Sequence, residues 1–588
     1  MTDLLRASAL ALAATTLMGI SPVETYSPQQ LALLDPTVRL ASLCSGRGGP
    51  QSMRARLSLA AAAVQSAALP TVPLHDDLGK VHFPITTANP LAQRYFDQGL
   101  SYAYGFNHAA AIASFRAAQA ADPNCAMCYW GEAMAHGPNI NAPMDPATNA
   151  RSVALAVYAA WLASKGSPAE QALTGAMLKR YSIDPKADRA TLDAAYADAM
   201  LAAARALPDN DDIAVLAAES AMDTLPWNYW TPDKNPQPRL GEAVQLVETV
   251  YARNPEHPQA AHLYIHLMEN GPNPQKAEAA ADRLATPLAP GAGHLVHMPA
   301  HIYYRLGRWR DSIRVNIAGA RADEAWIKAS GDKGLVRYGY YPHNVHFIVT
   351  SAQMAGDMPT AIREARKLSQ ILDPATSAQI AWIQAINAAP YFAASQFAAP
   401  GQVLAMKAPD DRLPYVGAMR HYARATAYAN LHNKLGFDRE LAALSRVRQS
   451  DVLKPMIDQG VPAPDLLLLA ETVAKARFAS SSGRLNDAIK LYRDAIEVEA
   501  KIPYMEPPYW YFPVHQSLGA SLYRAGKYRE AQEAFTAALA RYPNNGWALY
   551  GLAASERALG NRARAAATQA ALSRAWMGDP RWLKMERI

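Results

Sequence analysis

Residues 99–123 read GLSYAYGFNHAAAIASFRAAQAADP, and small, aromatic and proline residues stand in this stretch at fixed offsets. These anchors are Gly99, Tyr102, Ala111, Phe115, Ala118 and Pro123. The same frame recurs in GASLYRAGKYREAQEAFTAALARYP at residues 519–543 and, in shorter form, in AHIYYRLGRWRDSI from residue 300. The chain's 42 prolines suit many short helices separated by tight turns. Self-similarity at a fixed spacing indicates a repeat architecture.

Numbered within a frame of 34 residues, the anchors of the first stretch fall at positions 8, 11, 20, 24, 27 and 32. This spacing resembles the tetratricopeptide repeat (TPR) family, in which two antiparallel helices bury a seam of small and large residues. The resemblance covers roughly residues 90–580. It implies an all-α fold, a right-handed superhelix of stacked antiparallel helix pairs (a TPR-like α-solenoid), whose concave groove faces ligands.

Three segments are expected along the chain. Residues 1–80 are expected to form a leader or N-terminal extension, residues 90–410 an N-terminal and central TPR-like array, and residues 411–588 a C-terminal TPR-like array. Within the first segment, MRARLSLAAAAVQSAALP begins at Met53 and places two arginines before a short apolar core. Residues 53–70 are therefore expected to be a signal peptide of a bacterial exported protein, periplasmic or secreted. A leader that does not function would leave the protein in the cytoplasm.

Charge and hydropathy argue against nucleic-acid binding and against a transmembrane anchor. The formal net charge of +6 is small for 588 residues, and no basic stripe is interleaved with aromatic residues, so nucleic acid is not expected to bind. No apolar run of about 18 residues follows the N-terminal region, so the mature chain is expected to carry no transmembrane anchor.

Histidine placement tests the repeat frame independently, because the frame rests on glycine, alanine and aromatic residues. The chain has only 15 histidines, yet GHLVHMPAH at residues 293–301 holds three of them. In three successive repeats, histidines fall at positions 2, 5 and 9 and a glutamate at position 12 of the frame, which forms one stripe about 60° wide along the first helix. The stripe consists of His262, His266, Glu269, His294, His297, His301, His343 and His346. The TPR resemblance implies that it faces the concave groove.

Neutral imidazole is the commonest metal ligand, and two imidazoles three or four residues apart on a helix can hold one ion. His262 with His266 and His297 with His301 are such pairs, and Glu269 could add an oxygen ligand. Pro299 lies between the last two histidines and is expected to kink or delay the helix, tilting His294 and His297 toward a common point. The stripe predicts a site for transition-metal ions, copper, zinc or iron, that holds one ion or two.

Two functions stay open at this point. In the first, the groove binds metal and acts as a metal-dependent enzyme, with an oxidoreductase favoured over a hydrolase because Leu263 stands where the zinc-peptidase motif HExxH has its general base. In the second, the groove is a metal-free scaffold that binds a peptide or protein. A small molecule or peptide is a further expected occupant of the groove, and the loop at residues 224–238 is expected to pack as a plug or to cover the groove as a cap.

The only cysteine pair is CAMC at residues 125–128, which is expected to begin a helix. Three roles are open for it: small buried residues in the helix seam, a local disulfide in an oxidising compartment, or a copper(I) site that includes Met127.

Overall fold

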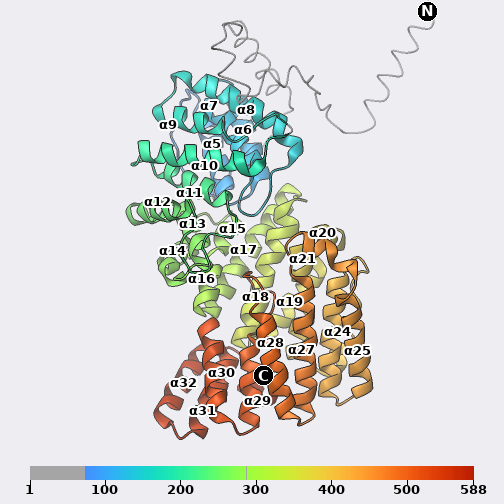
Figure 1. Ribbon diagram of the computed structural model, residues 1–588. Helices are drawn as coiled ribbons and strands as arrows, with labels where there is room; N and C mark the ends of the chain where they lie inside the picture. Colours follow the sequence, from blue (N-terminus) through green and yellow to red (C-terminus); the bar gives the residue numbers. More distant parts are fainter. Residues whose placement is uncertain (1–72, 185, 287) are drawn as a thin grey trace, which may run out of the picture. The chain divides into compact units, whose positions relative to one another are not determined.

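The computed structural model describes residues 73–588 except 185 and 287, and the described chain is built from helices joined by loops (Figure 1). Within these residues no strand occurs, and β-type pairing is limited to two isolated bridges, Asn139 with Ala142 and Trp230 with Pro236. The predicted all-α fold is therefore confirmed. The expected leader, including the signal peptide at residues 53–70, lies outside the described residues apart from its last few positions.

The described chain divides into two compact units. Unit 1 comprises Pro84–Phe96 and Ile112–Ile213, and unit 2 comprises Pro73–Phe83, Asp97–Ala111 and Ala214–Ile588. All eight residues of the predicted histidine stripe belong to unit 2. The predicted division between two arrays at residue 410 stays a prediction.

Unit 1 shows how a repeat hairpin packs. Its helices include α7 (Ala126–His136), α8 (Asn149–Leu162), α9 (Pro168–Met177) and α10 (Arg189–Ala206), while α5 (Pro90–Tyr104), α6 (His108–Ala121) and α11 (Asp211–Asp223) each span a unit boundary. The ring of Phe115 packs 5.5 Å from that of Phe96. A Cβ atom at Gly131, on the next helix, would lie only 2.4 Å from the same ring. The large anchor of one hairpin thus fills the space that a glycine of the next leaves open.

The first helices of unit 2 carry the histidines. They are α12 (Leu240–Arg253), α13 (Pro258–Glu269), α14 (Glu278–Ala285), α15 (Gly293–His297), α16 (Pro299–Leu306), α17 (Trp309–Ser330), α18 (Tyr341–Ala355) and α19 (Met358–Ile371). Two of these helices end at the predicted glycine anchors, Gly307 with φ 68° and Gly356 with φ 75°. Glycine adopts this left-handed conformation without steric cost, so each anchor stops its helix and starts the turn of a hairpin.

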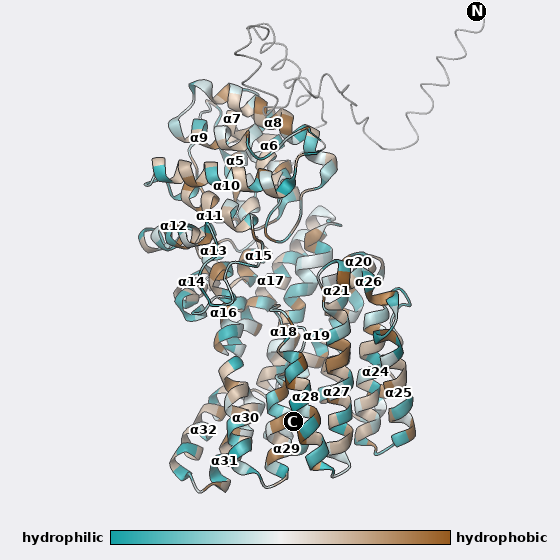
Figure 2. Ribbon diagram, in the orientation of Figure 1, coloured by the Kyte–Doolittle hydropathy of each residue, from teal (hydrophilic) through white to brown (hydrophobic). Residues whose placement is uncertain are grey.

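Helices farther along unit 2 continue the array. They are α20 (Pro374–Gln379), α21 (Ala381–Ile386), α22 (Ala389–Phe397), α23 (Pro400–Leu404), α24 (Pro414–Asn430), α25 (Lys434–Arg448), α26 (Lys454–Asp458), α27 (Ala463–Ser481), α28 (Leu485–Glu499), α29 (Val514–Arg524), α30 (Tyr528–Arg541), α31 (Gly546–Ala558) and α32 (Arg562–Ala575). Successive helices pack in pairs, α24 with α25 and α27 with α28, and α24 also packs on α27 (Figure 1). Hydrophobic and hydrophilic residues alternate along these helices (Figure 2), as expected when one face packs and the other meets water.

Phe535 repeats the seam of unit 1. Cβ atoms built on Gly519 of α29 and Gly551 of α31 would lie 2.9 and 2.1 Å from its ring. The stacked antiparallel helix pairs predicted from residues 519–543 are therefore present, with the predicted residues at the seam.

Candidate metal centre

Six of the seven predicted histidines come together in two groups of three. Group A consists of His262, His266 and His294, and group B consists of His297, His301 and His343. Within each group, one nitrogen atom per ring lies within 4.8 Å of the others. The rings of both groups are buried, except that His343 is half-buried.

The helices explain the grouping. His262 and His266 lie one turn apart on α13, as predicted, and His297 and His301 flank the break between α15 and α16 at Pro299. The helix does stop and restart there, because proline has no N–H to donate. The break does not bring His294 and His297 to one point, however: it places them in different groups.

Glu269 joins the two groups. Its Oε1 accepts a hydrogen bond of 2.7 Å from Nδ1 of His266, and its Oε2 accepts one of 2.6 Å from Nδ1 of His301. A carboxylate only accepts, so both Nδ1 atoms carry hydrogen and both Nε2 atoms keep a lone pair in the neutral rings. Burial raises the pKa of Glu269, but the two histidines together hold it below its ordinary value. Glu269 thus orients one imidazole of each group. Its predicted role as an oxygen ligand stays a prediction.

Two amide side chains orient further rings in the same way. Gln259 donates to Glu219 at 3.0 Å, which leaves its Oε1 to accept from Nδ1 of His262 at 2.9 Å. Asn316 donates to the carbonyl of Ser312 at 2.7 Å, and its Oδ1 accepts from Nδ1 of His297 at 2.6 Å. Four imidazoles therefore present Nε2 lone pairs to the interior. Histidines that bind metal ions are usually oriented by such a second hydrogen bond.

The Nε2 atoms face one another closely. In group B, Nε2 of His297 and Nε2 of His301 are 2.9 Å apart. Two lone pairs at this distance repel unless a cation or a proton lies between them. In group A, Nε2 of His266 is buried and has no hydrogen-bond partner, and Nε2 of His262 lies 3.2 Å from Nε2 of His294. A buried acceptor without a partner is costly, so Nε2 of His266 fits a bound ion.

Burial also favours the neutral, ligating form of most of these rings. It lowers the pKa of His262, His294, His297 and His343 well below the ordinary value, and like charges from neighbouring histidines lower it further. His301 differs, since burial lowers its pKa but the carboxylate of Glu269 raises it by more.

One phenylalanine packs against each group. The ring centroid of Phe106 lies 4.7, 6.0 and 5.2 Å from those of the three histidines of group A. That of Phe347 lies 5.0, 4.9 and 5.0 Å from those of group B. Phe106 has φ 54°, in the left-handed region. This conformation is unfavourable for a bulky residue, so the packing around the ring must offset its energy. Across the groups, ring centroids of His266 and His301 are 5.9 Å apart, so groups A and B form one histidine centre.

Two loops cover the histidine centre. The loop at residues 224–238 packs as predicted: the ring centroids of Trp227 and His266 are 5.1 Å apart in an edge-to-face arrangement, and Trp230 donates to the carbonyl of Leu267 at 2.8 Å. The loop between α28 and α29, residues 500–513, was not predicted to take part. Its Tyr504 donates to Glu269 at 3.3 Å and also bonds Glu506.

His346 is the predicted histidine that joins neither group. Its Nε2 is hydrogen-bonded to the hydroxyl of Tyr511 at 2.7 Å, again in the loop at residues 500–513. Glu506 of the same loop lies with Glu269 and His301 in a third cluster. The sequence pattern does not predict Glu506 as a site residue. Burial raises the pKa of Glu506 to about 8. Sequence offers no signal for either contact, because the partners are more than 150 residues apart.

The C-terminal hairpins carry a recognisable family signature. The tetratricopeptide repeat family model matches residues 522–587, which span the end of α29 through α32 and include the seam of Phe535 and Gly551. The hairpins at residues 522–587 are therefore tetratricopeptide repeats. No curated protein sequence matches the chain.

Solved structures built from helical repeats are only distantly similar to this chain. The human IFIT1 dimer with m7Gppp-AAAA is 12% identical with a TM-score of 0.27, covering 83% of this chain and 91% of that one. Yeast Tom70 is 12% identical with a TM-score of 0.24, covering 84% and 93%. The P58(IPK) TPR domain is 14% identical with a TM-score of 0.20, covering 80% and 98%. Similarity at this level carries no information about the ligand.

Two further features concern the cysteine pair and the length of the apolar helices. Cys125 and Cys128 form a disulfide, so the seam and copper(I) alternatives for free thiols do not describe the structure. In the described part of the chain, no helix is both long and apolar enough to cross a membrane.

Proposed function

We propose that this protein binds two transition-metal ions, one in group A and one in group B, through the Nε2 atoms of His262, His266, His294, His297, His301 and His343. The observation that carries the proposal is the set of four Nδ1 hydrogen bonds to Glu269, Gln259 and Asn316. They turn imidazole lone pairs toward one another in a buried space, where each has no better partner than a cation.

The donor atoms limit the choice of metal. Three imidazoles suit copper, zinc or iron, whereas magnesium and calcium prefer oxygen ligands. Three protein ligands leave a position open on each ion, as in catalytic rather than structural sites. Zn–N or Cu–N contacts of about 2.0–2.1 Å require only small adjustments of rings whose nitrogens already lie within 4.8 Å.

The metal-free peptide scaffold is the alternative. A groove that binds a peptide must expose its recognition surface, but the histidine face is buried and two loops cover it. These contacts favour metal over a peptide at this position. A peptide surface elsewhere on the array stays compatible with them.

An enzyme built on this centre would be an oxidoreductase rather than a hydrolase. Leu263 stands in place of the HExxH general base, and Glu269 already accepts from two histidines. Two adjacent copper or iron ions that each change by one electron could together exchange two electrons with one substrate. The disulfide of Cys125 and Cys128 supports the proposal that the protein works in an oxidising compartment after export.

Elemental analysis of protein purified without a polyhistidine tag tests the proposal. We expect two metal ions per chain in the wild type, loss of one in the double variant His262→Ala, His266→Ala, and loss of the other in His297→Ala, His301→Ala. His346→Ala is the matched control, a buried histidine beside the centre that should keep both ions. Folded wild-type protein that takes up no copper, zinc or iron, or equal loss in the control, would overturn the proposal.

A further inference from the structure

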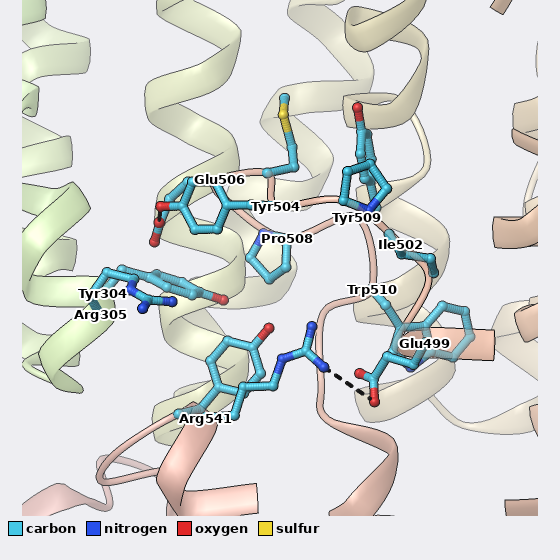
Figure 3. A pocket seen from close by; sticks show the side chains of 13 residues that line it. Tyr304, Arg305, Glu499, Ile502, Tyr504, Glu506, Pro508, Tyr509, Trp510 and Arg541 are labelled. Atoms are coloured by element: carbon cyan, nitrogen blue, oxygen red, sulfur yellow. Dashed lines mark hydrogen bonds and ion pairs between the residues drawn. The ribbon is translucent and has the colours of Figure 1, made fainter. Parts of the chain in front are cut away.

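A cavity lies beside the histidine centre in unit 2. Figure 3 shows its lining side chains, which come from α16, from the end of α28, from the loop at residues 500–513 and from the end of α30. The empty space among its lining residues, open solvent included, is about 540 Å³. Its residues include Tyr304, Arg305, Tyr504, Tyr509, Trp510 and Tyr542.

Five of the thirteen residues that line the cavity are aromatic. In Figure 3, the rings of Tyr304 and Tyr504 lie on the side of Arg305, and Pro508 stands between them and Tyr509. The hydroxyl of Tyr304 is buried and has no hydrogen-bond partner. Tyrosine and tryptophan offer flat apolar faces with a polar edge, which suits a planar ligand that carries a polar group.

The two arginines of the cavity differ in their partners. Arg541 lies 3.6 Å from the carboxylate of Glu499 on the far side of the cavity (Figure 3). Arg305 has no carboxylate within ion-pair distance in the described chain, and its buried Nε has no hydrogen-bond partner. The guanidinium of Arg305 lies 5.7 Å from the ring centroid of Tyr504 and so borders the aromatic wall. It is a cation available to an incoming anion.

The cavity adjoins the histidine centre through shared residues. Tyr504 lines the cavity and donates to Glu269, which orients both groups. Glu506 lines it as well and clusters with His301. A ligand in the cavity would therefore be separated from the metal-binding face by one layer of side chains.

We propose that this cavity binds a small aromatic carboxylate, with the carboxylate on the guanidinium of Arg305 and the ring against the tyrosine faces. Guanidinium and carboxylate match as two parallel N–H···O bonds, which makes arginine selective for this group. The aromatic walls supply stacking contacts that a saturated ring cannot make equally well. Binding rests on the cavity alone, so it requires no metal and is independent of the proposed function.

Isothermal titration of metal-free protein with three probes tests the proposal. The probes are 4-hydroxybenzoate, its neutral analogue 4-hydroxybenzamide, and cyclohexanecarboxylate, which keeps the charge but lacks the aromatic ring. We expect saturable binding of 4-hydroxybenzoate and at least tenfold weaker binding of the other two. Because these comparisons use the wild-type protein, they do not depend on a variant that folds.

Arg305→Met tests the role of the guanidinium and should weaken binding of 4-hydroxybenzoate at least tenfold. Arg305→Lys should weaken it less, since the charge stays but the paired hydrogen bonds are lost. Arg310→Met removes an exposed arginine from α17 outside the cavity and should change nothing. Absence of saturable binding, equal affinity for acid and amide, equal affinity for the aromatic and saturated acids, or full affinity in Arg305→Met would each overturn the proposal.

Discussion

The Nε2 atoms of His297 and His301 lie 2.9 Å apart, while the Nδ1 atoms of both rings donate to oxygen atoms of Asn316 and Glu269. Each neutral ring carries one hydrogen, and in both rings that hydrogen is on Nδ1. Neither Nε2 atom therefore has a hydrogen to donate to the other. The contact needs a cation or an additional proton. In group A the Nδ1 atoms of His262 and His266 are likewise bonded to Gln259 and Glu269, and Nε2 of His266 is buried without a partner. Nε2 of His262 lies 3.2 Å from Nε2 of His294, which can supply the hydrogen between them because its Nδ1 has no partner.

Glu269→Gln tests whether the carboxylate orients the imidazoles of both groups. A glutamine can accept from one histidine but points an N–H at the other, so one ring must turn or lose its hydrogen bond. We expect metal affinity to fall about 10- to 100-fold, the usual effect of removing such a partner. Titration against a competing chelator measures it. Glu278→Gln, a more exposed carboxylate on α14, is the control, and equal affinity in both variants would show that Glu269 does not orient the site.

Gly551→Ala tests the seam that defines the repeat. The new Cβ would stand 2.1 Å from the ring of Phe535, so the substitution should cost about 1–3 kcal/mol of unfolding free energy. Gly417 of α24 has no atom within 4 Å of its built Cβ. Gly417→Ala should therefore stabilise the protein by about 0.5–1 kcal/mol, because alanine is the better helix former. Denaturant titration of both variants checks the opposite signs, and a shift in the same direction would contradict the packing.

Glu499 should make stability depend on pH. Burial raises its pKa from 4.5 to about 7, although Arg541 lowers it. The folded state therefore holds the proton more tightly than the unfolded state, and this contribution, complete below about pH 4.5, is lost as the pH rises toward 7. The total loss is up to roughly 3 kcal/mol.

Glu499→Gln removes that titration. Its unfolding free energy relative to the wild type should rise between pH 4.5 and pH 8, as measured by denaturant titration at each pH. A difference between the two proteins that stays constant over this range would show that Glu499 does not hold its proton in the folded state.

The local sequence pattern is sufficient to predict the helical hairpins and the histidine pairs that lie on one helix. The frame of glycine, alanine and aromatic anchors predicted the hairpins, and the spacing of four residues predicted His262 with His266 on α13. Both follow from helix periodicity, which depends on neighbours in sequence.

Contacts between distant segments could not be predicted in this way. His262 and His346 share position 5 of the frame, yet only His262 enters a group, because Tyr511 of a loop 165 residues away bonds His346. Phe106 and Tyr504 likewise contact residues of the histidine centre from turns or loops that are distant in sequence. Their places depend on how the array stacks rather than on local spacing. The sequence predicts a helix break at Pro299. Which histidines the break separates into different groups depends on the positions of α13 and α18, which the sequence does not give.

Anomalous diffraction from crystals of the protein loaded with copper or zinc tests the central claim most directly. We predict two anomalous peaks inside unit 2, each about 2.0–2.1 Å from the Nε2 atoms of three histidines, one peak in group A and one in group B. Loaded crystals with no peak among these six rings, or with metal only at surface residues, would contradict it.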